Sequence, residues 1–234
     1  MDKLVYPVWK SQDISSKQFS SALLGEFKDR VLAAENVRGL KICVVDEAVA
    51  DAAPYRMEGI FQPGFDATVL VWLDDAAQRE GFESALRPHV ATFHGYLVGE
   101  TDQLPDYANK VTTGQRTPGM NQVVFLKKPD RLDHDEWLDI WQQLHTPIAI
   151  DTQSTFGYRQ NVVKQALTAG APDIDAIVEE NFPHAAISNR AAFYDALDNE
   201  ALYRQRETTM IESCARFIDF DKMDCIPTSE YFFK

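Results

Sequence analysis

The chain has 234 residues, of which 45% are hydrophobic and 25% charged. These proportions are typical of globular proteins and exclude a disordered or collagen-like chain. Acidic residues outnumber basic ones by 36 to 23, which gives a formal net charge of −13. Because nucleic acid and anionic membrane surfaces attract positive charge, we expect neither as a partner.

The three cysteines, Cys43, Cys214 and Cys225, show no spacing typical of a metal site or a disulfide framework. This usage favours a reducing compartment. The first ten residues do not resemble a signal peptide, and the longest apolar run, Val69–Leu73, is far too short to span a membrane. We therefore expect a cytoplasmic protein. The histidines lack metal spacing and no nucleotide-binding motif occurs, so we predict no metal and no cofactor.

The first part of the chain is repeated in the second. Residues 4–45 align without a gap on residues 122–163, which brings Gly39 over Gly157. After a shorter loop in the second copy, residues from Asp66 onward align on those from Asp175 onward. A doubled unit of about 110 residues accounts for this better than two unrelated domains. We place the repeats at residues 1–104 and 119–234, with a linker at 105–118 inside a polar, proline-containing stretch (102–118).

Each copy is predicted to run β-α-β-β-α-β. In the first copy we expect a helix after the cap Ser15. We also expect a second helix at Ala76–Leu86. Strands are expected at Val5–Trp9, Val37–Val45, Ala67–Leu73 and Gly95–Thr101. In the second copy a helix follows the cap Asp133, has an apolar stripe that reaches Ile148, and has His145 in its last turn. A second helix is expected at Ala191–Leu197, continuing through Ala201–Phe217. Strands are expected at Gln122–Lys127, Phe156–Val163, Ile174–Phe182 and Cys225–Phe232.

This order predicts an α+β fold of two ferredoxin-like repeats whose sheets pack face to face as a barrel within one chain, because each sheet has helices on one face only. Alternation along the third strands assigns the two faces. Ala67, Val69 and Val71, like Ala176 and Val178, should face the helices. The alternate residues of these strands are a mixture of polar and apolar side chains and should face the interior: Thr68, Leu70 and Trp72 in the first copy, and Ile177, Glu179 and Asn181 in the second. We expect such an interior to contain a cavity.

Three short segments of the second copy resemble the EthD-like family of dimeric α+β barrel proteins. His145 to Ala149 (HTPIA) resembles the family's His-x-Pro segment. Tyr158 to Val163 (YRQNVV) resembles its Tyr-x-Gln-Asn-His-Val strand, and Asp175 to Glu179 (DAIVE) its Asp-Gly-Ile-x-Glu strand. Val162 replaces the usual second histidine, which argues against chemistry that needs two. The resemblance covers residues 118–233.

The resemblance implies a small-molecule protein. Some members act as decarboxylases or dehydratases on aromatic polyketides, and cofactor-free monooxygenases share the superfamily. The first copy has Phe27, Cys43 and Leu70 where the second has His145, Asn161 and Glu179. If there is a site, the second copy should supply its polar residues, and the first an apolar wall. We therefore expect a hydrophobic or aromatic ligand.

His145 and Glu179 are the candidate catalytic residues. His145 continues the inward stripe of its helix, where it would shuttle a proton with its tautomer fixed by Glu179 or Asn161; alternatively it caps the helix. Glu179 in a partly apolar cavity would have a raised pKa, or it would simply pair with Arg159. We expect the substrate-binding residues to line a pocket between the sheets, with His145 at its rim: Trp72, Leu70, Arg159, Asn161 and Tyr158. Trp9 and Phe125 are expected to add aromatic lining to it.

Two further functions stay open at this point. Tandem barrels of the chlorite dismutase-like group bind haem through one histidine of the second copy, which would make His145 an iron ligand and Glu179 its hydrogen-bond partner. The other alternative is a non-catalytic barrel that works by binding or assembly. A homodimer would then use helices or loop edges, because the sheets are already paired within the chain.

Overall fold

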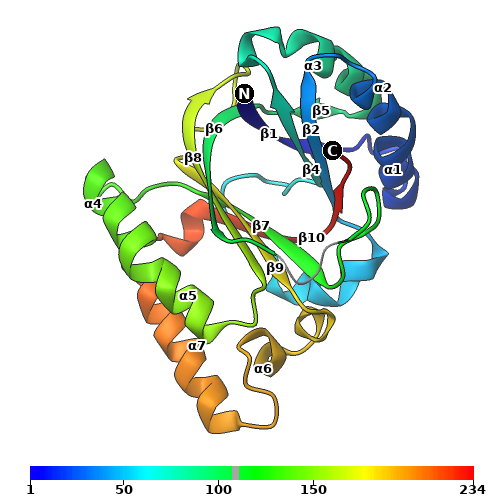
Figure 1. Ribbon diagram of the computed structural model, residues 1–234. Coiled ribbons are helices and arrows are strands. Elements are labelled where there is room, and N and C mark those ends of the chain that lie inside the picture. Colours follow the sequence, from blue (N-terminus) through cyan, green and yellow to red (C-terminus); the bar gives the residue numbers. More distant parts are fainter. Residues whose placement is uncertain (107–110) are drawn as a thin grey trace.

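Eight antiparallel strands form a closed barrel in the computed structural model, which describes residues 1–106 and 111–234 (Figure 1). Around the ring the strands run β2-β4-β1-β6-β8-β9-β7-β10 and return to β2. Two short strands, β3 (Met57–Glu58) and β5 (Thr92–Phe93), pair with β10 and β1. The barrel strands are β1 (Asp2–Trp9), β2 (Val37–Val44), β4 (Ala67–Leu73), β6 (Tyr96–Leu104), β7 (Met120–Leu126), β8 (Gly157–Ala166), β9 (Ala176–Phe182) and β10 (Met223–Phe232).

The two halves of the barrel are joined by hydrogen-bonded seams, which goes beyond the expected packing of two sheets face to face. One seam pairs β6 with β8, and the other pairs β10 with β2. The first half contributes the order β2-β4-β1-β6 and the second β8-β9-β7-β10. Closure leaves each of these eight strands with a partner on both sides, so the ring has no free edge.

The predicted alternation along the strands is confirmed. Val69 and Val71 point outward into a cluster with Phe19 and Phe27 of the first-half helices. In the second half, Val178 and its neighbours pack in the same way on Trp137 and Trp141. Leu70 and Ile177 point inward and belong to a separate interior cluster. The outward sets could be assigned because an all-apolar strand face must be covered by helices.

Helices cover the barrel on two sides (Figure 1). Ser15 and Asp133 cap the first helix of each half as predicted. On one side lie α1 (Ser16–Ala22), η1 (Leu23–Phe27), α2 (Lys28–Leu32), η3 (Ala76–Gln78), α3 (Glu80–Leu86) and η4 (Arg87–His89). On the other lie α4 (His134–Asp139), η5 (Ile140–His145), α5 (Thr146–Thr152), α6 (Arg190–Phe193) and α7 (Glu200–Ala215), with η2 (Glu47–Tyr55), η6 (His184–Ile187) and η7 (Phe220–Lys222) among the connections.

Two helix boundaries differ from those expected. The helix that begins at His134 extends beyond the turn that contains His145. A π-helical turn, η5, ends at His145, and α5 follows it without a break to Thr152, with Pro147 in its first turn. The helix expected from Ala191 onward is broken between α6 and α7, where Asp195 and Asp198 adopt positive φ angles of 48° and 60°.

The expected linker at 105–118 is described only in part, because residues 107–110 lie outside the described residues. Before it, β6 extends to Leu104. After it, Thr117 donates its backbone N–H to Glu230, which ties this segment to β10. No helix within residues 1–106 and 111–234 is both long and apolar enough to cross a membrane.

Candidate functional site

A buried ion network fills the barrel interior next to its open end. Both oxygens of the fully buried Glu179 carboxylate accept from lysines: Lys3 Nζ lies 2.6 Å from Oε1 and Lys41 Nζ 2.7 Å from Oε2. Asn161 donates to the same carboxylate over 3.1 Å. Both lysines come from the first half, so the apolar wall expected from that half is wrong. Alternation along β1 and β2 aims them inward, where the fixed carboxylate compensates their burial.

The raised pKa expected for Glu179 is also wrong. Burial alone would raise it, but Lys3, Lys41 and Arg159 hold the pKa of this carboxyl well below its ordinary value. Glu179 is therefore ionised at neutral pH and has no proton to give. Its contacts are those of the centre of an ion network rather than of a general acid.

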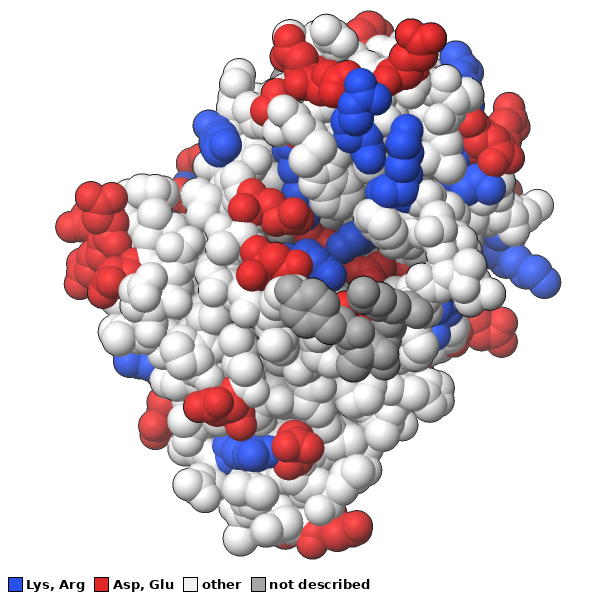
Figure 2. Space-filling view, viewed as in Figure 1, with Lys and Arg blue, Asp and Glu red and all other residues white. Residues whose placement is uncertain are grey.

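Arg159 and Trp72 lie above this network, at the open end of the barrel. They line a cavity of about 450 Å³ together with Lys41, Glu230 and other residues. In Figure 2 basic and acidic side chains gather in the hollow near the centre of the face shown. Two other residues expected to line this pocket do not do so: Asn161 is fully buried beside Glu179, and Leu70 is buried in the apolar interior.

The far end of the barrel is closed by aromatic rings. Trp9 packs edge-on against Phe61 at 5.2 Å between ring centroids, and Phe125 lies 5.3 Å from Phe61 and 5.2 Å from Phe65. Trp9 and Phe125 therefore do not share a pocket with Trp72 as expected. They sit at opposite ends of the strands, a separation that alternation alone does not reveal.

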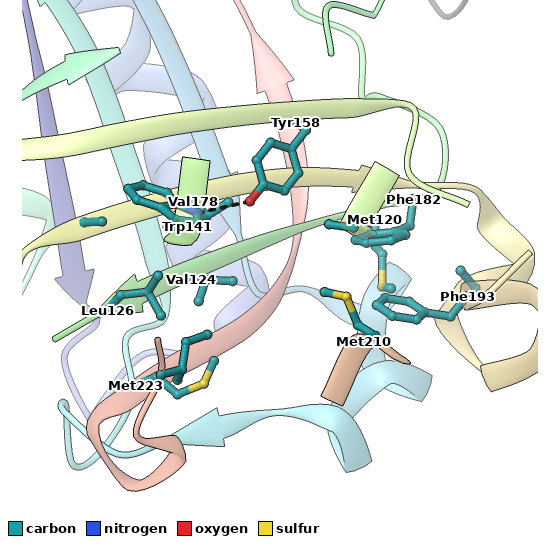
Figure 3. Close-up of a cluster of buried hydrophobic side chains, with 14 of the residues drawn as sticks. Met120, Val124, Leu126, Trp141, Tyr158, Val178, Phe182, Phe193, Met210 and Met223 are labelled. Carbon is teal, nitrogen blue, oxygen red and sulfur yellow. Dashed lines mark hydrogen bonds between the residues drawn. The ribbon is translucent and has the colours of Figure 1, made fainter. Parts of the chain in front are cut away.

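A second, more apolar cavity of about 500 Å³ lies outside the barrel, between the second-half strands and helices η5, α6 and α7. Figure 3 shows part of its wall, where Val124 and Leu126 of β7, Tyr158 of β8 and Met210 of α7 face a common layer. Ile211 and Phe220 line it and are 50% and 42% exposed, so the cavity opens to solvent beside α7. Its size and apolar lining are typical of small-molecule sites.

Glu180 is the acidic group in this outer cavity. It lies on β9 between Gln122 of β7 and Tyr158 of β8, its cross-strand neighbours. The side chain is buried, and Oε1 has no hydrogen-bond partner within the described residues. Burial without a counter-charge raises the pKa of Glu180 to about 8. It is thus a neutral acid at neutral pH, with a group free to bind a ligand.

His145 lines the same cavity, 4% exposed. Its Nδ1 lies 3.0 Å from Ser213 Oγ, and its ring packs on Phe217 with centroids 4.6 Å apart. Because Ser213 already accepts from Arg216, its own proton is available to Nδ1, which favours the tautomer protonated at Nε2. Burial, and then the charge of Arg216, lower the pKa of His145 to about 4, so the imidazole is neutral.

Three expectations for His145 are therefore wrong. It does not cap a helix end, because the helix continues through it. It does not sit at the rim of the barrel pocket, because its helix covers the outer face of β9 while Glu179 points inward. For the same reason neither Glu179 nor Asn161 can fix its tautomer, and Ser213 takes that place.

Haem bound by His145 with Glu179 as its hydrogen-bond partner does not fit this geometry. The two side chains lie on opposite faces of the sheet, so Glu179 cannot be the hydrogen-bond partner of His145, whose Nδ1 is engaged by Ser213.

Tyr158 also faces the outer cavity rather than the barrel interior, because it alternates with the inward Arg159. Its hydroxyl accepts a 3.2 Å hydrogen bond from Trp141 Nε1, which Figure 3 shows as a dashed line. The strand phase that assigned Arg159 and Asn161 to the interior already placed Tyr158 outside, so the sequence contained the signal. The same phase puts Glu180, two residues after Val178, on the outer face of its strand.

No protein-family model matches the chain, and no curated protein matches it significantly. Among solved structures, an anthrone oxidase-like protein superposes with a TM-score of 0.58 at 10% identity, over 100% of this chain and 91% of that one. A putative monooxygenase from Lactobacillus acidophilus NCFM superposes with 0.50 at 11% identity, over 100% and 95%. At these identities the likeness shows the α+β barrel fold alone.

Proposed function

We propose that the protein binds a flat aromatic carbonyl compound in the outer cavity and transfers a proton to or from it. The observation that carries this proposal is Glu180: a buried carboxyl with a pKa near 8 and an unpartnered oxygen, inside an otherwise apolar cavity of about 500 Å³. The anthrone oxidase-like neighbour suggests the ligand class, since anthrone is a flat aromatic ketone.

Glu180 is placed to act in two ways. Protonated, it donates a hydrogen bond to the substrate carbonyl oxygen; ionised, it accepts a proton from a carbon conjugated with that carbonyl, which in anthrone is the CH₂ group on the opposite side of the central ring. The pKa near 8 keeps both forms accessible around neutral pH. Such proton transfer is common to decarboxylation, dehydration and cofactor-free oxygenation, the reactions implied by the resemblance to EthD-like proteins. His145, neutral and held by Ser213, supplies a second polar group on the helix side.

The two halves are proposed to be copies of one ferredoxin-like repeat, the second of them EthD-like. Their strand orders agree, and equivalent residues pair in register. Leu70 lies opposite Lys41, as Glu179 lies opposite Arg159. Both first helices contain a π-helical turn, ending at Phe27 and at His145, residues that the sequence repeat aligns. Since the ring has no free edge, any homodimer would use helices or loop edges, and light scattering measures whether it forms.

The experiment compares anthrone with anthracene, which has the same shape but no carbonyl. We expect anthrone to quench tryptophan fluorescence saturably, because Trp141 lines the cavity, and anthracene to bind several-fold more weakly. Glu180→Gln keeps the shape but cannot exchange a proton. It should slow anthrone consumption in air at least about tenfold. The wild-type rate should rise as pH increases through about 8, the pKa of Glu180.

Glu212→Gln, an exposed glutamate on α7, is the matched control and should behave as wild type. Unchanged consumption in Glu180→Gln, with a pH profile unlike that expected, would refute the proton-transfer role. Val178→Phe, which fills the cavity, should abolish anthrone binding, and persistence of binding would refute the location.

A further inference from the structure

The cavity at the open end of the barrel carries a different chemistry from the outer cavity. Its floor holds Lys41, Arg159 and Glu230, and its rim holds Glu100 and two aromatic rings, Trp72 and Phe232. The rings lie edge to face with centroids 6.4 Å apart. Phe232 is 41% exposed, which is unusual for a phenylalanine beside a charged pocket. A cavity with a charged floor and aromatic walls suits a flat ligand with a polar end.

Arg159 is the cation of this floor that lacks a close carboxylate. Its nearest acidic oxygens, on Asp102 and Glu230, are 3.8 and 3.9 Å away, beyond hydrogen-bond distance. Within the described part of the chain, its only hydrogen bond runs from Nη1 to Asn181 Oδ1, at 3.2 Å. A guanidinium has five N–H donors arranged to bind a carboxylate through two of them. Lys3 and Lys41 differ from Arg159 in this respect, because each of them already donates a hydrogen bond to the Glu179 carboxylate.

Glu230 supplies the complementary group. It is 6% exposed, and its Oε2 has no hydrogen-bond partner in the described residues although Lys41 Nζ lies 3.2 Å away as an ion pair. Burial would raise its pKa, but Lys41 and Arg159 lower it overall, so Glu230 is an anion. A ligand carboxylate on Arg159 needs a donor beside it to face this oxygen, because two bare carboxylates would repel.

We propose that the barrel mouth is a second binding site, for an aromatic hydroxycarboxylate of the salicylate type. The ligand carboxylate binds Arg159, its adjacent hydroxyl donates to Glu230 Oε2, and its ring packs against the aromatic rim formed by Trp72 and Phe232. The 3.9 Å between Arg159 Nη1 and Glu230 Oε2 matches a ligand that presents its acceptor and donor side by side. This site lies on the opposite face of β9 from the outer cavity.

Calorimetric titration with three probes tests the proposal. Salicylate has both groups, benzoate lacks the hydroxyl, and salicylamide lacks the charge. We expect salicylate to bind saturably in the millimolar range or tighter, benzoate several-fold more weakly, and salicylamide at least about tenfold more weakly. Absence of saturable salicylate binding, or equal binding of salicylate and salicylamide, would overturn the proposal.

Variants locate the site. Arg159→Gln should weaken salicylate binding at least about tenfold. Glu230→Gln should reduce the preference for salicylate over benzoate. Arg38→Gln is the charge-matched control, because Arg38 borders the cavity but its guanidinium is bound to Asp74 at 2.7 Å; it should change little. An equal loss in Arg38→Gln and Arg159→Gln would indicate general electrostatic attraction and refute direct binding.

Two further measurements keep the test decisive. If Arg159→Gln fails to fold, Phe232→Leu, a change at an exposed ring, should still weaken salicylate binding several-fold; no change would count against the site. Saturating anthrone should leave salicylate binding unaffected. Displacement would place salicylate in the outer cavity and refute the barrel-mouth site, whereas failure of anthrone to bind bears only on the function proposed above.

Discussion

The layer between helices and strands is packed solid in the first half of the molecule and hollow in the second. In the first half, Phe19, Leu23 and Phe27 of the helix meet Val69 and Val71 of β4 in a fully buried cluster. In the second half the corresponding layer encloses the outer cavity of about 500 Å³. The same arrangement of elements therefore supports either a core or a pocket, and a few side chains decide which.

Two positions account for much of the difference. The sequence repeat aligns Phe27 with His145 and Val71 with Glu180, so the second half has polar groups where the first has apolar ones. Buried polar groups without full hydrogen bonding cost stability, and Glu180 Oε1 is such a group. The second half therefore has a cavity where the first half has a packed core. Exchanging residues between these positions tests that interpretation.

Phe27→His should have the largest effect. Phe27 is fully buried in the first-half cluster, so the change leaves a cavity and introduces imidazole nitrogens among apolar neighbours. We expect the free energy of unfolding, measured by urea titration near neutral pH, to fall by about 3 to 5 kcal/mol. Phe220→His, at an exposed phenylalanine, is the control, with an expected change of under about 1 kcal/mol. A small effect at Phe27 would mean that this layer is not packed solid.

Glu180→Val should stabilise the protein at alkaline pH. The folded pKa, about 8, lies above the ordinary value of 4.5, so the folded state binds more protons than the unfolded state between these values. The wild type should therefore lose stability as pH rises through this window, by an amount on the order of 3 kcal/mol. Urea titrations at mildly acidic pH and above pH 8 should show a smaller loss in the variant. Parallel curves for the two proteins would show that Glu180 is not desolvated.

His145→Phe should have the smallest effect and act at acidic pH. The folded pKa of about 4 lies below the ordinary 6.5, so the folded state binds fewer protons, and this residue costs stability as pH falls from about 6.5 to 4. Relative to wild type, the variant should gain about 1 to 2 kcal/mol across that interval. The measurement is again urea titration, with His134→Phe as the exposed control. A gain independent of pH would indicate packing alone.

The barrel could be predicted because its signals are local. Ser15 and Asp133 marked the helix starts, and alternation along β4 and β9 separated outward from inward residues. Contacts between residues far apart in the sequence were harder to predict. Lys3 and Lys41 lie far from Glu179 in sequence, and a lysine in a strand normally faces solvent. Only the closed ring brings both onto one carboxylate, which reverses the expected shift of the Glu179 pKa.

The position of His145 was misjudged for a different reason. All candidate residues were assigned to a single pocket between the sheets. A residue on a helix cannot reach that pocket, because the helix lies on the outer face of its sheet. The π-helical turn that ends at His145 has no clear sequence signal, so the end of the helix was placed too early. Glu180 follows Ala176 and Val178 on the strand face that we expected to meet the helices, but its lack of a partner depends on the tertiary packing around it.

The seam between β2 and β10 has a consequence for how the chain folds. It joins strands separated by most of the sequence, with Val44 opposite Ser229 and Lys41 opposite Phe232. Contacts of such long range carry a large loop-closure entropy, which slows their formation. The first-half strands and helices can assemble from more local contacts, while the edge of β2 stays unpaired until β10 arrives. During that interval the open edge is exposed to pairing with other chains, so refolding yield should fall with increasing protein concentration.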